Sequence, residues 1–148
     1  MKYIDINSKL LNKQYETHMK YIQERYPRAL YKAFVSAERF HDYELVEIRY
    51  FFDRALYRTK CEKVGIKIQS NILGDERYLE IVFKGITYFD LSSNADTRCE
   101  LFHCDTIYCA ELDITIDGLF SFEVLTSDKT KIRIIFKSAT IVRSERKR

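Results

Sequence analysis

Residues 79–88 read Leu79-Glu80-Ile81-Val82-Phe83-Lys84-Gly85-Ile86-Thr87-Tyr88, and residues 132–141 read Ile132-Arg133-Ile134-Ile135-Phe136-Lys137-Ser138-Ala139-Thr140-Ile141. Fifty-three positions apart, the second stretch repeats an Ile, a Phe, a Lys and a Thr of the first. Two β-hairpins of the same build would give this pattern, so it predicts two similar hairpins in one antiparallel sheet. Two copies are too few for a solenoid, which stacks three or more repeats.

The N-terminal part of the chain shows a helical period. Apolar residues follow one another at spacings of three and four, which predicts an amphipathic helix over residues 8–26 with Ser8 as its N-cap. The stripe consists of Leu11, Tyr15, Met19, Ile22 and Tyr26, with His18 on its flank. Pro27 separates this helix from a second one, predicted over residues 28–41. The second helix would bury Leu30, Phe34, Ala37 and Phe40 or His41.

From Asp42 onward the apolar residues alternate with a period of two, as in a strand. Strands are expected over residues 46–52, 64–70, 78–84, 86–91, 107–116, 119–125, 131–137 and 139–143, with residues 53–62 forming a turn or short helix. No long helical pattern separates them, so a parallel sheet is not expected. The fold class is therefore α+β, with two N-terminal helices packed on a mostly antiparallel β-sheet containing two similar hairpins. We expect a single domain over 1–148, made of a helical part (1–41), a sheet (42–143) and a basic tail (144–148).

The composition suits a folded protein of modest charge. The 148 residues are 46% hydrophobic and carry a net charge of +3, which is too small to imply a nucleic-acid partner by itself. Residues 61–142 hold 9 basic and 13 acidic side chains, so the sheet is mildly acidic. No signal-peptide pattern and no apolar run of membrane-spanning length occurs, so we expect a cytoplasmic protein with no membrane partner. Its four cysteines are expected to be thiols.

The clearest candidate surface lies on the strand over 107–116. Ala110, Leu112, Ile114 and Ile116 alternate with Glu111, Asp113, Thr115 and Asp117, which would place the acidic residues together on the solvent face. We interpret Glu111, Asp113 and Asp117 as a partner-binding face, where complementary charge speeds association. The alternative is cross-strand ion pairing with Lys131, Arg133 or Lys137.

No metal site, cofactor or catalytic set is expected. Cys99, His103, Cys104 and Cys109 lie close in sequence, but their spacing does not match the paired ligands of structural zinc sites. His41 and Asp42 would suit an oriented acid–base pair, yet adjacent residues rarely face each other in regular secondary structure. Common catalytic motifs are missing from the sequence, so we do not expect an enzyme.

The Ile81-Val82-Phe83-Lys84 stretch and residues 132–137, together with the overall size, resemble small uncharacterised bacterial proteins that include immunity proteins of toxin–immunity pairs. The resemblance covers mainly residues 64–142 and transfers no functional residue. It implies a cytosolic protein that neutralises a toxin by tight binding without catalysis. Immunity proteins against nucleases are commonly acidic, and only the acidic sheet face of this chain fits that pattern.

Our expectation is therefore a non-catalytic protein-binding module, with an immunity protein as one such case and a toxin as its partner. The alternative is a nucleic-acid-associated protein that uses the basic helices and the tail Arg143-Ser144-Glu145-Arg146-Lys147-Arg148. A nucleic-acid partner is the less favoured of the two. The sequence leaves the oligomeric state open.

Overall fold

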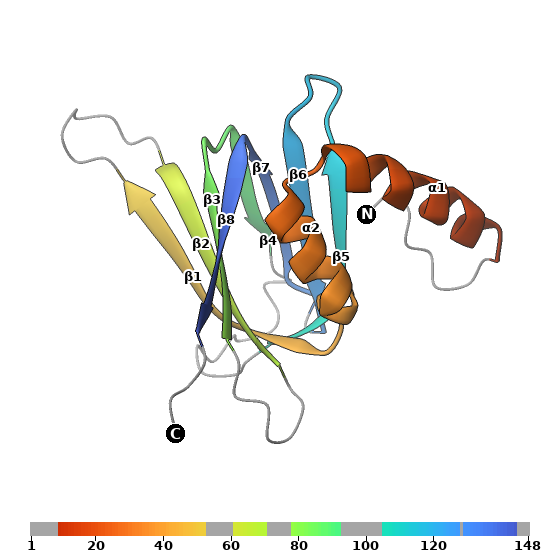
Figure 1. The fold of residues 1–148 in the computed structure, drawn as a ribbon. Coiled ribbons are helices and arrows are strands. Elements are labelled where there is room, and N and C mark those ends of the chain that lie inside the picture. The colour runs from red at the N-terminus through yellow and green to blue at the C-terminus, as the bar shows by residue number, and fades with distance from the viewer. Residues whose placement is uncertain (1–8, 53–60, 71–77, 93–104, 128, 145–148) are drawn as a thin grey trace.

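The computed structural model describes residues 9–52, 61–70, 78–92, 105–127 and 129–144. Two helices, α1 (Lys9–Arg25) and α2 (Arg28–Ser36), and a short 3-10 turn, η1 (Glu38–Phe40), precede the sheet (Figure 1). The strands are β1 (Tyr43–Phe52), β2 (Cys61–Ser70), β3 (Tyr78–Lys84), β4 (Tyr88–Ser92), β5 (Asp105–Ile114), β6 (Phe120–Thr126), β7 (Lys131–Phe136) and β8 (Ser138–Ser144). The fold is α+β, as predicted. The Ser8 N-cap and residues 53–60 of the expected turn or short helix lie outside the described residues, whereas Cys61 and Glu62, expected in the same segment, belong to β2.

The eight strands form one sheet in the order β4-β7-β6-β5-β1-β2-β3-β8, and every neighbouring pair is antiparallel. The two predicted hairpins are present as β2–β3 and β6–β7. They are not neighbours in the sheet, since β5 and β1 lie between β6 and β2, while β8 lies beside β3 and β4 beside β7.

The repeated stretches run beyond the hairpins and pair with each other. Each passes from one strand into the next through a kink, at residues 85–87 between β3 and β4 and at Lys137 between β7 and β8. The two kinks lie side by side. The Lys137 amide donates to the Lys84 carbonyl at 3.1 Å, and the Thr87 amide donates to the Ile135 carbonyl at 2.9 Å. The two copies of the repeat therefore form one bent two-stranded ribbon, in which β3 pairs with β8 and β4 with β7.

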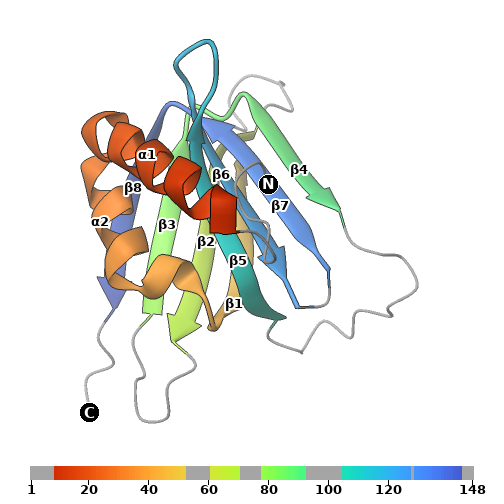
Figure 2. The same ribbon diagram turned by 90° about the vertical axis from the view of Figure 1, so that its right-hand side faces the viewer.

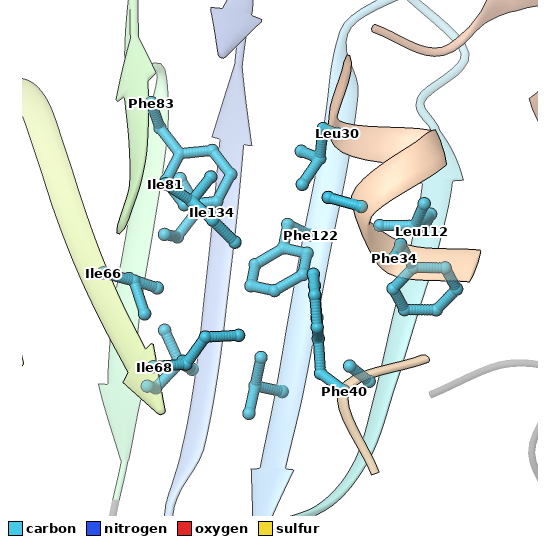
Figure 3. Close-up of a cluster of buried hydrophobic side chains, with 14 of the residues drawn as sticks. Leu30, Phe34, Phe40, Ile66, Ile68, Ile81, Phe83, Leu112, Phe122 and Ile134 are labelled. Carbon is cyan, nitrogen blue, oxygen red and sulfur yellow. The ribbon is translucent and has the colours of Figure 1, made fainter. Parts of the chain in front are cut away.

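The core lies between the concave face of the sheet and the helices. Figure 3 shows Leu30 and Phe34 of α2 and Phe40 of η1 on one side, with Phe122 and Leu112 close by and the β3 residues Ile81 and Phe83 opposite. Phe40 packs against Phe34 with ring centroids 5.4 Å apart and against Phe122 at 6.2 Å. Aromatic packing of this kind explains the many Phe and Tyr residues of the sequence.

The second predicted helix ends early. It stops at Ser36, and the chain then makes a left-handed turn in which Glu38, Arg39 and Phe40 all have positive φ angles of 48°, 62° and 59°. L-residues adopt this conformation at a cost of about 1–2 kcal/mol each, and burial of the Phe40 ring offsets part of it. Phe40 is buried as expected, but it reaches the core from this turn, while His41 points to solvent.

Candidate protein-binding site

The structure does not place the three predicted acidic residues, Glu111, Asp113 and Asp117, together on one exposed face. Ala110 and Leu112 are buried, as expected for the core side of β5, but Glu111 on the opposite side is only 3% exposed. Helix α1 contacts β5, and its Tyr15 lies close enough to Glu111 for the two side chains to interact electrostatically. Burial raises the pKa of Tyr15, Arg39 lowers it, and the Glu111 carboxylate raises it further. Glu111 is therefore not part of an open docking face, and the prediction of three aligned, exposed carboxylates is wrong.

Polar side chains of α1 and of the residue that follows it bind the backbone of β5 and β6. The His18 Nε2 atom lies 2.8 Å from the Leu112 carbonyl oxygen, and His18 is buried. Tyr26, the residue after the helix, donates its hydroxyl to the carbonyl of Ser121 in β6 at 2.8 Å. Burial, followed by the nearby Asp113 carboxylate, raises the pKa of Tyr26 well above its ordinary value.

The predicted strand also ends sooner than expected. β5 stops at Ile114, and residues 115–119 form a tight turn before β6. Ile116, expected in the core, is instead fully exposed to solvent. Asp117 is also exposed and lies in this turn, while Asp113 is half-buried at its base and accepts a hydrogen bond from the Ile114 amide at 2.8 Å.

The turn between β5 and β6 is held by several hydrogen bonds. The Thr115 amide donates to the Leu119 carbonyl at 2.8 Å, and the Leu119 amide donates to the Thr115 hydroxyl at 3.0 Å. The Gly118 amide donates to the Thr115 carbonyl at 2.9 Å, and the φ angle of Gly118 is +76°, which glycine adopts without strain. Figures 1 and 2 show this hairpin projecting beyond the other strands. We name residues 113–119 the hairpin tip.

Cross-strand ion pairing occurs on the outer side of this half of the sheet at Glu123, which the sequence did not single out. The Lys131 Nζ atom lies 2.9 Å from Glu123 Oε1, and Glu123 also lies opposite Arg133 in register. Burial alone would raise the pKa of Glu123, but the hydrogen bond from Lys131 acts against it and the pKa is lowered overall. The sequence did not identify Glu123, because a single acidic residue in an apolar strand gives no signal.

His41 and Asp42 do face each other, contrary to expectation. The His41 Nδ1 atom lies 2.9 Å from Asp42 Oδ2, because both residues follow the left-handed turn and Asp42 itself has a φ angle of 63°. Both side chains are more than half exposed. The rings of His41 and Tyr108 are 6.3 Å apart.

Cys99, His103 and Cys104 lie outside the described residues, as do residues 145–148 of the basic tail. Cys109 is a half-buried thiol whose pKa is raised by burial and by the carboxylates of Glu111 and Glu123. Among the described residues, no group of three or more His, Cys, Asp or Glu side chains is placed to hold a metal ion. No described helix is long and apolar enough to cross a membrane.

No protein-family model matches the chain, and no curated protein matches it significantly. Among solved structures, the chain is similar to an uncharacterised protein from Neisseria gonorrhoeae, with 20% identity and a TM-score of 0.49. The match covers 69% of this chain and 91% of the other. At this level of similarity, no function can be transferred.

Proposed function

We propose that this protein is a non-catalytic, cytoplasmic protein-binding module that contacts its partner through the hairpin tip. One observation carries the proposal: Ile116 is a fully exposed β-branched residue at the end of a hydrogen-bonded, projecting turn. An apolar side chain on a rigid support loses little conformational entropy when it enters a pocket of a partner.

Asp117 and Asp113 give the same tip a negative charge, so the partner surface would combine an apolar pocket with basic residues around it. Such charges mainly increase the association rate and select among partners. Of the three partner-binding residues predicted from the sequence, this proposal retains Asp113 and Asp117 and omits Glu111. Neutralisation of a toxin is the specific form of this function that the resemblance in β3 and β7 supports.

The test compares affinity capture from the native lysate with tagged wild-type protein, Ile116→Asp and Val35→Asp. Val35 is the matched control because it is an exposed apolar residue on helix α2, away from the tip. We expect a nuclease-resistant protein partner to elute with wild type and Val35→Asp and to be lost with Ile116→Asp. Equal recovery with all three proteins would exclude the tip as the contact. Partners lost from the wild-type eluate after nuclease treatment would favour the nucleic-acid alternative.

A further inference from the structure

Strand β4 is one of the two ends of the sheet. It pairs with β7 on one side, and no strand within the described residues pairs with its other side. Figure 2 shows β4 as the outermost strand, beyond β7. The opposite end is different, since helix α2 packs beside β8. An open strand edge presents backbone amide and carbonyl groups that can pair with another extended segment.

Exposed apolar side chains flank this edge on both faces of β4. Tyr88, which lies opposite Ile135 on the outer face, is 45% exposed. On the inner face, Leu91 is 46% exposed. Next to it, the ring of Phe89 packs edge-on against Tyr50 of β1, with centroids 5.2 Å apart. An added strand would therefore find apolar contacts on either side, in addition to backbone hydrogen bonds.

The negative charge of Asp90 determines which extended segments pair favourably with the open edge of β4. Asp90 is the only charged residue of β4, and its register partner on β7 is Arg133. On the open side, a residue placed opposite Asp90 would meet the carboxylate directly. Opposite charges in such cross-strand positions are stabilising and like charges are destabilising.

We propose that the open edge of β4 binds an extended segment of a partner protein as an additional antiparallel strand, with a Lys or Arg opposite Asp90. A second copy of this chain fits less well, because antiparallel pairing of β4 with itself about Asp90 would place two aspartates opposite each other. This surface is separate from the hairpin tip, so the inference goes beyond the proposed function and does not depend on it.

The test uses two synthetic peptides of about seven residues, with alternating Val and Thr and either Lys or Glu at the centre. Binding is measured from amide shifts in two-dimensional NMR spectra of the labelled protein. We expect shifts at residues 88–92 and about threefold to tenfold tighter binding of the Lys peptide. Peptides with N-methyl groups on alternate residues should not bind, because they cannot complete the ladder.

Two variants make the test specific. Asp90→Lys should reverse the preference in favour of the Glu peptide, and Asp90→Asn should remove the preference while keeping the side-chain size. Asp117→Lys, which changes the hairpin tip, should leave the peptide preference unchanged.

Three outcomes would overturn the proposal. The first is equal binding of both peptides to the wild-type protein. The second is amide shifts confined to residues outside β4. The third is full protection of the β4 amides from hydrogen exchange before peptide is added, which would mean that this chain or a second copy already covers the edge. Dependence of that protection on protein concentration would identify the second copy.

Discussion

The rings of Phe83 and Phe136 lie 4.7 Å apart, centroid to centroid, at an interplanar angle of 64°, although the two residues occupy the same position in the two copies of the repeat. Both are completely buried. The bent ribbon brings the copies together, so the phenylalanine that the repeat keeps meets its counterpart in the core.

This contact predicts energetic coupling between the two copies. Phe83→Ala should lower the free energy of unfolding by about 3–5 kcal/mol, as expected for loss of a buried ring. Phe83→Leu and Phe136→Leu keep most of the volume. A double-mutant cycle with them should give a coupling energy of about 0.5–1.5 kcal/mol in urea unfolding. Strict additivity would show that the rings stabilise the core independently.

The kink between β3 and β4 depends on Gly85. Its φ angle is +64°, and a Cβ atom at this position would lie 3.0 Å from both Cβ and Cγ of Lys137. We expect Gly85→Ala to be more destabilising than Gly118→Ala, because Gly118 has a similar φ angle of +76° but no atom within 4 Å of the added Cβ. The Gly118 variant should cost about 1 kcal/mol from backbone strain alone. Lys137→Ala should recover part of the Gly85→Ala loss, and equal melting temperatures of the two glycine variants would contradict the steric argument.

Two buried tyrosines should respond in opposite ways to loss of the hydroxyl. In the part of the chain that the structure describes, the Tyr15 hydroxyl is the one buried side-chain polar atom that lacks a hydrogen-bond partner. Tyr15→Phe should be neutral or stabilising, since it removes an unsatisfied polar group. Tyr26→Phe should cost about 1–2 kcal/mol, because the Tyr26 hydroxyl donates to Ser121. Thermal unfolding measures the stability of both variants. An equal loss of stability in the two would mean that the Tyr15 hydroxyl has a hydrogen-bond partner in solution.

The left-handed turn predicts an unusual response to glycine. Glu38 has a φ angle of 48°, which glycine adopts freely, so Glu38→Gly should be neutral or stabilising by up to about 1 kcal/mol. Lys32→Gly, within the regular helix α2, should instead cost about 1 kcal/mol. Chemical unfolding measures both, and a similar loss from the two substitutions would show that the turn is not left-handed in solution.

The pair of Glu123 and Lys131 predicts a dependence of stability on pH. Because the pKa of Glu123 is lowered by folding, the ionised carboxylate stabilises the protein above its unfolded-state pKa, and this contribution disappears as the pH falls through the folded-state pKa. Glu123→Gln should therefore be less stable than wild type at neutral pH, by roughly 1 kcal/mol. The difference should vanish only when the pH has fallen below this lowered folded-state pKa, where the wild-type carboxylate is protonated as well. A difference that stays constant across this range would point to packing instead of charge.

The sequence predicted most of the secondary structure because periodicity is a local property. Each expected strand corresponds to an observed one, and α1 lies within one residue of its predicted C-terminal end. The errors occur where tertiary contacts override the pattern. Ile116 continues the apolar alternation of β5, yet it lies in the turn because Thr115 and Leu119 close the hairpin. The alternation correctly placed Glu111 opposite Leu112, but it could not show that Glu111 would be buried.

The pairing of the repeated stretches was beyond sequence reasoning for a different reason. The repeat predicts two similar hairpins, but it does not say which strand lies beside each hairpin. That choice depends on the kinks at Gly85 and Lys137. His41 and Asp42 show the same limit, since their contact follows from a backbone conformation that L-residues rarely adopt.

The bent ribbon has a consequence for synthesis of the chain on the ribosome. β3 is complete at Lys84, but its outer neighbour β8 ends at Ser144 and is the last of the described strands to be synthesised. At about 5–20 residues per second, the nascent chain exposes the outer side of β3 for on the order of several seconds. During that time its Ile, Val and Phe side chains have no final neighbour on that side, and the growing chain is most open to aggregation or to chaperone binding. Once β8 has been synthesised, it can pair with β3 and cover that side.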